Sequence, residues 1–201
     1  MQQLVIFLIG TDGAKINPGN KGGVIHLLET SINKPVHWII CLLHANELPL
    51  KILFSHLDGK TEGPNVFSGL IGKQLNKCQN TSLANFKKIN NPNFMIIEKE
   101  VMDELSSDQL YLYKIIRFIA TKEEYNDIGL YSCGQLHNAR WLTLANRICR
   151  LYISTEDPEE NLQTMTKFII SYFTLHQAGS ILSTTLLYTM VLKFFSEMCN
   201  D

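Results

Sequence analysis

The chain has 201 residues, of which 45% are hydrophobic, and its formal net charge is -1 at pH 7. This size and composition favour a globular protein with one ordinary core or two small ones, and they exclude a disordered tail. The near-zero charge excludes a general electrostatic attraction to nucleic acid, because phosphates attract clustered Lys and Arg. Any contact with DNA is therefore expected to be local.

Cysteine usage and hydropathy bear on the cellular compartment. Five cysteines lie at positions 41, 78, 133, 149 and 199, and an odd, scattered set does not form a disulfide framework. The amino terminus lacks the basic region and cleavage site of a secretory signal. The apolar stretches 4–9 and 181–195 are shorter than the roughly 20 residues of a membrane-spanning helix. We therefore expect an intracellular protein, nuclear or cytoplasmic, without a membrane span.

Residues 1–57 have the pattern of a small α/β unit. Residues 4–9 and 36–43 are apolar runs without polar alternation, which is typical of strands covered on both faces. A helix is predicted between them, with one apolar face formed by Val24, Ile25, Leu27, Leu28 and Ile32. A strand–helix–strand connection predicts that the two strands are parallel neighbours with a right-handed crossover.

Two chemically active side chains come directly after these strands. Asp12 follows the first strand and His44 follows the second. Because ligand-facing groups of parallel sheets lie at the carboxyl ends of the strands, we expect both residues at one rim, within roughly 10–12 Å. The alternatives are that Asp12 is a turn residue before Gly13, that His44 is a structural histidine, and that Cys41 is a small buried residue.

The rest of the chain divides into a connection and a helical part. Residues 58–105 are rich in Asn, Gly and Lys, which predicts a long connection, and residues 106–201 are predicted to be mostly helical. Ser106 and Gln109 form a capping-box pattern before an apolar helical face made by Leu112, Ile115, Ile116 and Ile119. Asp157 and Pro158 predict the start of another helix.

A further helix is predicted over residues 139–154, capped by Asn138. Its arginines, Arg140, Arg147 and Arg150, are predicted to fall mainly on the side opposite the apolar face. This basic face is the local candidate for contact with DNA phosphates, and the alternative is an ordinary solvated face. Trp141 has the spacing of a core residue, and the stem of Arg140 is long enough to cover apolar surface.

The order of these motifs resembles the catalytic core of hAT-type cut-and-paste DNA transposases, over roughly residues 4–175. The resemblance implies a partial ribonuclease H-like fold, in which Asp12 corresponds to the second acid of an Asp-Asp-Glu site that binds Mg²⁺. It places Cys41 and His44 in the Cys-x-x-His motif of the family. It also places Arg140 and Trp141 at the front of a helical insertion, where the tryptophan is implied to help handle the DNA end.

The departures from the family pattern indicate a truncated, transposase-derived protein without DNA cleavage or strand-transfer activity. Strand transfer depends on two metal ions held by several carboxylates, and here Asp12 stands alone. The first Asp of the family is expected on an upstream strand, and the final Glu is expected after the insertion. One carboxylate binds hydrated Mg²⁺ weakly, so no resident cofactor is expected.

Other possibilities follow from single features. Cys41, His44, Cys133 and His137 have the number and types of side chains for a tetrahedral zinc site, which would make the chain a zinc-stabilised module. The glycine-rich stretch 17–23 is a weak candidate for phosphate binding. A role in binding other proteins is favoured over catalysis. The uncharged apolar run 4–9 also predicts self-association through an unpaired strand edge.

Overall fold

The structure of the chain is a computed structural model. It describes residues 7–11, 19, 22–40, 42–92, 94, 96–123, 127–137 and 140–178. Within these ranges, side chains are not described for residues 7–8, 39–40, 42–46 and 175–178. The chain divides into two units, Met1–Pro49 and Leu50–Asp201, and the division falls inside one helix.

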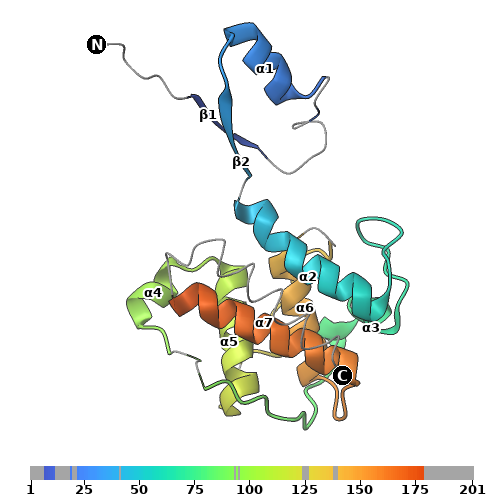
Figure 1. Cartoon of the computed structure of the whole chain (residues 1–201). Coiled ribbons are helices and arrows are strands. Elements are labelled where there is room, and N and C mark those ends of the chain that lie inside the picture. Colours follow the sequence, from blue (N-terminus) through green and yellow to red (C-terminus); the bar gives the residue numbers. More distant parts are fainter. Residues whose placement is uncertain are drawn as a thin grey trace. The chain divides into compact units, whose positions relative to one another are not determined.

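The first unit contains a two-stranded parallel sheet and one helix (Figure 1). Strand β1 (Phe7–Thr11) pairs with strand β2 (Val36–Ile40) from Phe7 opposite Val36 to Thr11 opposite Ile40. Helix α1 (Val24–Ile32) connects the strands. The predicted strand–helix–strand unit with parallel strands is therefore confirmed, and the protein is of the mixed α/β class. The predicted extent of the second strand, residues 36–43, is wrong at its end, because β2 stops at Ile40 and the apolar residues Leu42 and Leu43 belong to helix α2 (Leu42–Asp58).

Helix α1 lies where the sequence predicts it, but its apolar residues are less buried than the pattern suggests. Ile25 is buried, whereas Val24, Leu27 and Leu28 are exposed. The unit is held together partly by polar contacts, because Glu29 Oε1 accepts a hydrogen bond from the Val36 amide at 3.0 Å. Residues 4–6 of the predicted edge lie outside the described residues, so self-association through that edge stays a prediction.

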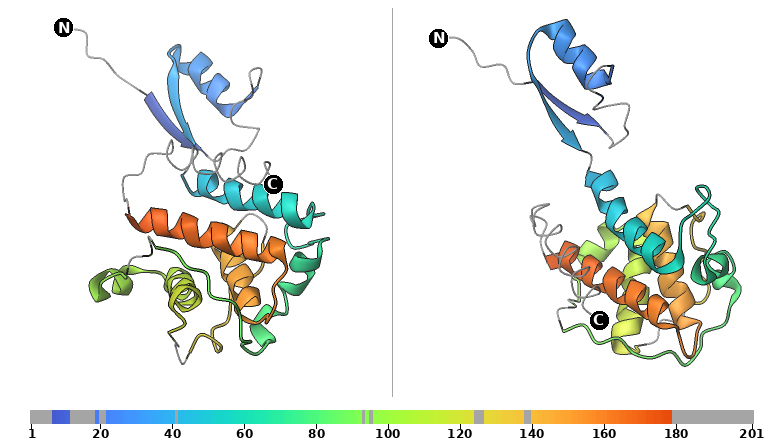
Figure 2. Two further views of the ribbon diagram at one scale, coloured as in Figure 1. Left: turned by 60° about the horizontal axis from the view of Figure 1, so that its bottom comes forward. Right: turned by 45° about the vertical axis from the view of Figure 1, so that its right-hand side comes forward.

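The second unit is helical and surrounds helix α6 (Trp141–Ile153). This helix contacts α5 (Ser107–Thr121), α7 (Glu160–Ala178) and the short 3-10 helix η1 (Cys78–Asn80) (Figure 1, Figure 2). Every residue from 143 to 153 is buried. One face of α6 is apolar, and its polar side chains Asn146, Arg147 and Arg150 donate hydrogen bonds to backbone carbonyl groups, which allows this whole stretch of the helix to be buried.

Helix α5 forms as its sequence predicts. The Ser106 side chain accepts a hydrogen bond from the Gln109 amide, and the Gln109 side chain accepts one from the Ser106 amide. This capping box satisfies amides that a helix leaves unpaired at its start. The apolar face predicted from the sequence is fully buried, and it comprises Leu112, Ile115, Ile116 and Ile119.

The other predicted helix starts are close to the observed ones. Arg140 is the N-cap of α6, so the prediction that Arg140 and Trp141 begin a helix is confirmed. The predicted cap Asn138 lies outside the described residues. Helix α7 begins at Glu160, two residues beyond the first-turn position predicted for Pro158, and residues 156 and 157 form a bend before it.

The segment 58–105, predicted to be a long connection, contributes to the core of the second unit. It contains α3 (Leu70–Gln74), η1 and α4 (Lys99–Glu104), and its buried side chains join the main cluster at Phe67, Ile71, Leu75, Cys78 and Phe86. It begins where α2 (Leu42–Asp58) ends, and both carboxylate oxygens of Asp58 accept amide hydrogen bonds, from Ile71 at 2.8 Å and Gly72 at 2.7 Å. The segment is therefore part of the core of the second unit and not only a connection between units.

No helix among the described residues has the length and hydropathy of a membrane span. The apolar stretch 181–195 lies outside those residues.

Candidate functional site

The most unusual feature of the second unit is a pair of buried arginines on α6. Arg147 is 5% exposed and Arg150 is 2% exposed. Both arginines were predicted to lie on a basic face exposed to solvent or to DNA phosphates, and that prediction is wrong. The physical reason is that backbone carbonyl groups of two neighbouring segments, rather than water, receive the guanidinium hydrogen bonds.

Arg147 joins two segments that are far apart in the sequence. Its Nη1 donates to the Leu75 carbonyl at 2.7 Å, and its Nε and Nη2 donate to the Gly134 carbonyl at 3.0 and 2.8 Å. A longer contact of 3.5 Å joins Nη2 to the Cys133 carbonyl. Gly134 also lies so close to α6 that a Cβ there would approach Thr143 Cγ2 to 2.8 Å, so glycine suits this position.

Arg150, one helical turn later, repeats the arrangement. Its Nη2 donates to the Thr81 carbonyl at 3.0 Å and to the Gly129 carbonyl at 3.2 Å, and its Nη1 donates to the Ile128 carbonyl at 3.3 Å. Together the two side chains tie segment 75–81 and segment 128–134 to α6. We call Arg147, Arg150 and these carbonyl groups the arginine clamp.

The charge of the clamp is not balanced by an ion pair among the described residues. The ion pairs found there are Lys114–Asp127 and Arg117–Glu123, and neither includes a clamp arginine. Among the same residues, Arg150 Nε is buried without an acceptor. Burying a guanidinium without a carboxylate costs free energy of folding. A neighbouring group that can become an anion would offset part of this cost.

Two cysteine thiols supply such groups. Cys78 and Cys133 are buried, and the Cys78 thiol donates a hydrogen bond at 3.1 Å to the Leu75 carbonyl, which also accepts from Arg147. The interaction with Cys133 lowers the pKa of Cys78, and the positive charges of Arg147 and Arg150 add to this lowering against the opposing effect of burial. The interaction with Cys78, together with burial, raises the pKa of Cys133.

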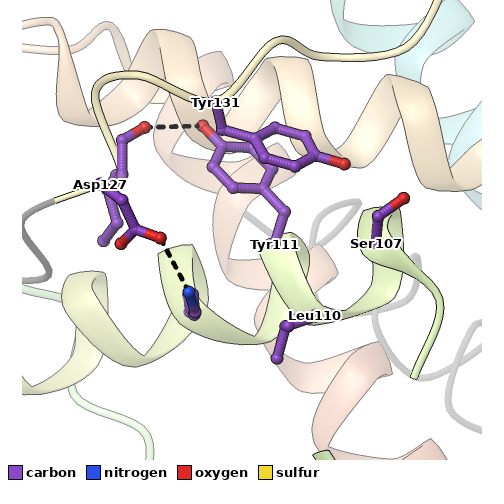
Figure 3. A pocket seen from close by; sticks show the side chains of 7 residues that line it. Ser107, Leu110, Tyr111, Asp127 and Tyr131 are labelled. Carbon is purple, nitrogen blue, oxygen red and sulfur yellow. Dashed lines mark hydrogen bonds and ion pairs between the residues drawn. The ribbon is translucent and has the colours of Figure 1, made fainter. Parts of the chain in front are cut away.

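On the solvent side of the clamp lies a cavity of about 180 Å³. Figure 3 shows the rings of two tyrosines overlapping in its wall, with Asp127 at one end and Ser107 at the other. The cavity is lined by residues of α5 and of the segment after it, namely Ser107, Leu110, Tyr111, Lys114, Asp127, Ile128 and Tyr131.

The walls of the cavity are fixed by aromatic stacking and by hydrogen bonds. The rings of Tyr111 and Tyr131 stack with centroids 3.9 Å apart, and the Tyr131 hydroxyl donates to Asp108 Oδ1 at 2.8 Å. Burial raises the pKa of Tyr111 strongly, so this wall is un-ionised. At the rim, the hydrogen bond from Lys114 at 2.9 Å lowers the pKa of Asp127.

The cavity and the clamp share one atom. The Ile128 carbonyl accepts hydrogen bonds from the Tyr111 hydroxyl and from Arg150 Nη1, both at 3.3 Å. The position of the cavity floor therefore depends on the clamp. Leu130, which lies in the chain between the lining residues Ile128 and Tyr131, is 85% exposed.

The remaining residues singled out from the sequence do not assemble with this site. Asp12 and Cys41 lie outside the described residues, and His44 lies within α2 with its side chain undescribed. That Asp12 and His44 lie at the same rim of the sheet therefore stays a prediction. Arg140 is exposed at the start of α6, and Trp141 is partly buried with its ring edge-on to Tyr172 of α7, at a centroid distance of 5.3 Å.

Of the predicted zinc ligands, Cys133 and His137 have described side chains. Cys133 is buried and its carbonyl lies 3.5 Å from Arg147 Nη2, whereas His137 is partly buried. Among the described residues, no group of three or more His, Cys, Asp or Glu side chains is placed to hold a metal ion. The four-ligand site includes Cys41, so it stays a prediction.

The arginines were predicted as candidate site residues but in the wrong environment, and the tyrosine cavity was not predicted. No local signal indicates the burial of Arg147 and Arg150, because the carbonyl groups that accept from them include Leu75 and Thr81, far from α6 in the sequence. The cavity had no local signal, because residues 107–114 and 127–131 come together only in the folded unit.

Comparison with protein-family models, with curated proteins and with solved structures gives no match to this chain.

The clamp makes a direct prediction about stability. Arg147→Met or Arg150→Met removes a donor from three carbonyl groups each; the Leu75 carbonyl keeps Cys78 and the Ile128 carbonyl keeps Tyr111, and each group left unsatisfied costs about 1–3 kcal/mol. The substitution also removes a buried positive charge, which is itself costly, but this gain offsets only part of the loss of unfolding free energy. We therefore expect each variant to lose about 3 kcal/mol or more of unfolding free energy in urea titrations. The exposed Arg140→Met is the matched control, with a change within about 0.5 kcal/mol. Equal small losses in all three variants would contradict the clamp.

Proposed function

We propose that this chain is a transposase-derived protein of the hAT type, and that it acts inside the cell by binding another protein rather than by cutting or joining DNA. The order of motifs supports the ancestry: Asp12 after one strand, Cys41 and His44 after the next, and Arg140 with Trp141 before a helix. In this proposal the β1–α1–β2 unit is part of an ancestral ribonuclease H-like sheet. The odd, scattered cysteines support a reducing, intracellular environment.

The composition of the motifs supports a non-catalytic role. The residues that carry the resemblance include a single carboxylate, Asp12. Two-metal phosphoryl transfer uses several carboxylates to hold cations about 3.5–4 Å apart. One carboxylate holds Mg²⁺ weakly, because the ion keeps its water unless several oxygen ligands replace it. The proposed function therefore includes no cofactor.

The observation that carries the proposal is the environment of the two arginines on α6. Arg147 and Arg150, which were candidates for phosphate contact, donate their hydrogen bonds to carbonyl groups inside the unit. A guanidinium that is nearly fully buried does not reach a DNA backbone. The helix that begins with Arg140 and Trp141 is thus a core element, and its basic residues stabilise the unit.

The cavity beside the clamp is the surface best suited to a protein partner. Its volume of about 180 Å³ is below the roughly 300–1,000 Å³ of small-molecule pockets, so it suits a single anchoring side chain. Its wall presents Leu110 and the stacked Tyr111 and Tyr131, and the 85% exposed Leu130 precedes Tyr131 in the chain. An apolar anchor surrounded by a polar rim is the usual arrangement of an interface centre. We propose an apolar side chain of a partner protein as the occupant.

Selection from a displayed peptide library on the folded full-length chain tests the interaction role. We expect enriched peptides that share one apolar anchor residue and that bind Leu130→Asp at least about tenfold more weakly, since a charge in the segment that lines the cavity opposes apolar burial. Leu70→Asp, at a leucine that is 66% exposed and is absent from the cavity lining, is the matched control and should bind normally. Enriched peptides that bind both variants equally, or no enrichment, would contradict the cavity as the binding site.

The same proposal predicts no DNA processing. Purified protein incubated with duplex DNA and Mg²⁺ or Mn²⁺ should produce neither nicks nor joined products, because the motifs that carry the resemblance include one carboxylate, Asp12, and a two-metal site uses several. Gel analysis of supercoiled plasmid and of labelled duplex ends provides the measurement. Nicking that Asp12→Asn abolishes would show an active metal site and overturn the non-catalytic role.

A further inference from the structure

The tyrosine cavity has a charged end, and the chemistry of that end narrows the kind of side chain that fits. Asp127 lies at this end (Figure 3), and Lys114 Nζ donates to Asp127 Oδ2 at 2.9 Å. The Asp127 side chain is nevertheless 61% exposed. An ionised carboxylate accepts up to about four hydrogen bonds, so Asp127 can accept another one from a bound group.

The rest of the cavity wall is less suited to receive a polar group. The hydroxyl groups of Tyr111 and Tyr131 each donate their proton to another group of the protein. Ser107, at the opposite end of the cavity, offers a neutral hydroxyl, which makes weaker hydrogen bonds than a carboxylate does. A hydrogen-bond donor on a ligand is therefore best received at Asp127.

The size and the wall of the cavity favour an aromatic ring. The volume is about 180 Å³, and an apolar protein cavity of roughly 150 Å³ holds one benzene ring. One wall is the stack of Tyr111 and Tyr131, whose rings lie 12° from parallel with centroids 3.9 Å apart. Tyr131 is only partly buried, so its ring is available for packing. Aromatic pairs gain interaction energy beyond that of area burial, which an aliphatic group of the same size does not.

From this geometry we propose that the cavity binds the phenol ring of a tyrosine from a partner protein, with the phenol hydroxyl at the Lys114–Asp127 end. The hydroxyl donates to the Asp127 carboxylate, and its oxygen can accept from the neighbouring ammonium, which carries three N–H donors. A phenyl ring has no polar tip, and an indole N–H only donates. The inference rests on the proposed interaction function, and it specifies the anchor that the function describes only as apolar.

Three small molecules test the anchor without a known partner. p-Cresol is the side-chain analogue of tyrosine, toluene lacks its hydroxyl, and 4-methylcyclohexanol lacks its aromatic ring. Each is titrated into the folded full chain, and binding is followed by the chemical shifts of the methyl groups of Leu110 and Ile128, which line the cavity. We expect p-cresol to bind at least about threefold more tightly than toluene, because of the charge-assisted hydrogen bond. A similar advantage over 4-methylcyclohexanol should follow from ring packing.

The substitutions separate the two contributions. Asp127→Ala removes the acceptor, so p-cresol should lose its advantage over toluene. Glu123→Ala is the matched control, because Glu123 is also paired with a cation of α5 and is 58% exposed, but is absent from the cavity lining. It should keep the advantage. Tyr131→Leu removes the ring stack, so the advantage of p-cresol over 4-methylcyclohexanol should disappear.

The comparison of the three probes on the unaltered chain decides the question even if a variant fails to fold. Toluene or 4-methylcyclohexanol that binds as tightly as p-cresol would overturn the tyrosine anchor and leave the apolar-anchor proposal in place. An unchanged advantage over toluene in Asp127→Ala would also contradict the proposed hydrogen bond. If none of the probes shifts the Leu110 and Ile128 methyl signals, both the tyrosine anchor and the cavity as a binding site are wrong.

Discussion

The second unit depends on two guanidinium groups that stand one helical turn apart on α6. Arg147 and Arg150 each bind carbonyl groups from segment 75–81 on one side and from segment 128–134 on the other. Neither segment continues a helix or a strand for long, so the backbone cannot satisfy these acceptors itself. The clamp replaces regular secondary structure at the place where α5, α6 and η1 meet.

The clamp has electrostatic consequences for its surroundings. Two buried positive charges favour any neighbouring group that ionises to an anion, and the Cys78 thiol is such a group. The same clamp fixes the Ile128 carbonyl, which also accepts from Tyr111 in the cavity wall. Stability, the pKa of Cys78 and the shape of the candidate binding surface therefore depend on the same side chains, which is why we place the functional site beside α6.

The parts of the fold that local rules govern were predictable from the sequence. The parallel β1–α1–β2 unit, the Ser106 capping box and the helix that begins after Arg140 each follow from patterns within a few residues. Segment 58–105 was harder to interpret, because its asparagines indicate turns while its core residues, such as Phe86, are widely spaced. The burial of Arg150 depends on carbonyl groups 21 to 69 residues away, and no local pattern encodes such contacts.

The most direct test of the clamp is nuclear magnetic resonance of the arginine side chains in the folded chain. The sequence contains four arginines, at positions 117, 140, 147 and 150. Hydrogen-bonded, buried guanidinium protons exchange slowly with water, whereas those of an exposed side chain exchange quickly. We expect separate, slowly exchanging guanidinium signals from Arg147 and Arg150 and a fast-exchanging signal from Arg140. Fast exchange at all of these arginines would show that the guanidinium groups are solvated, and it would contradict the account of this site.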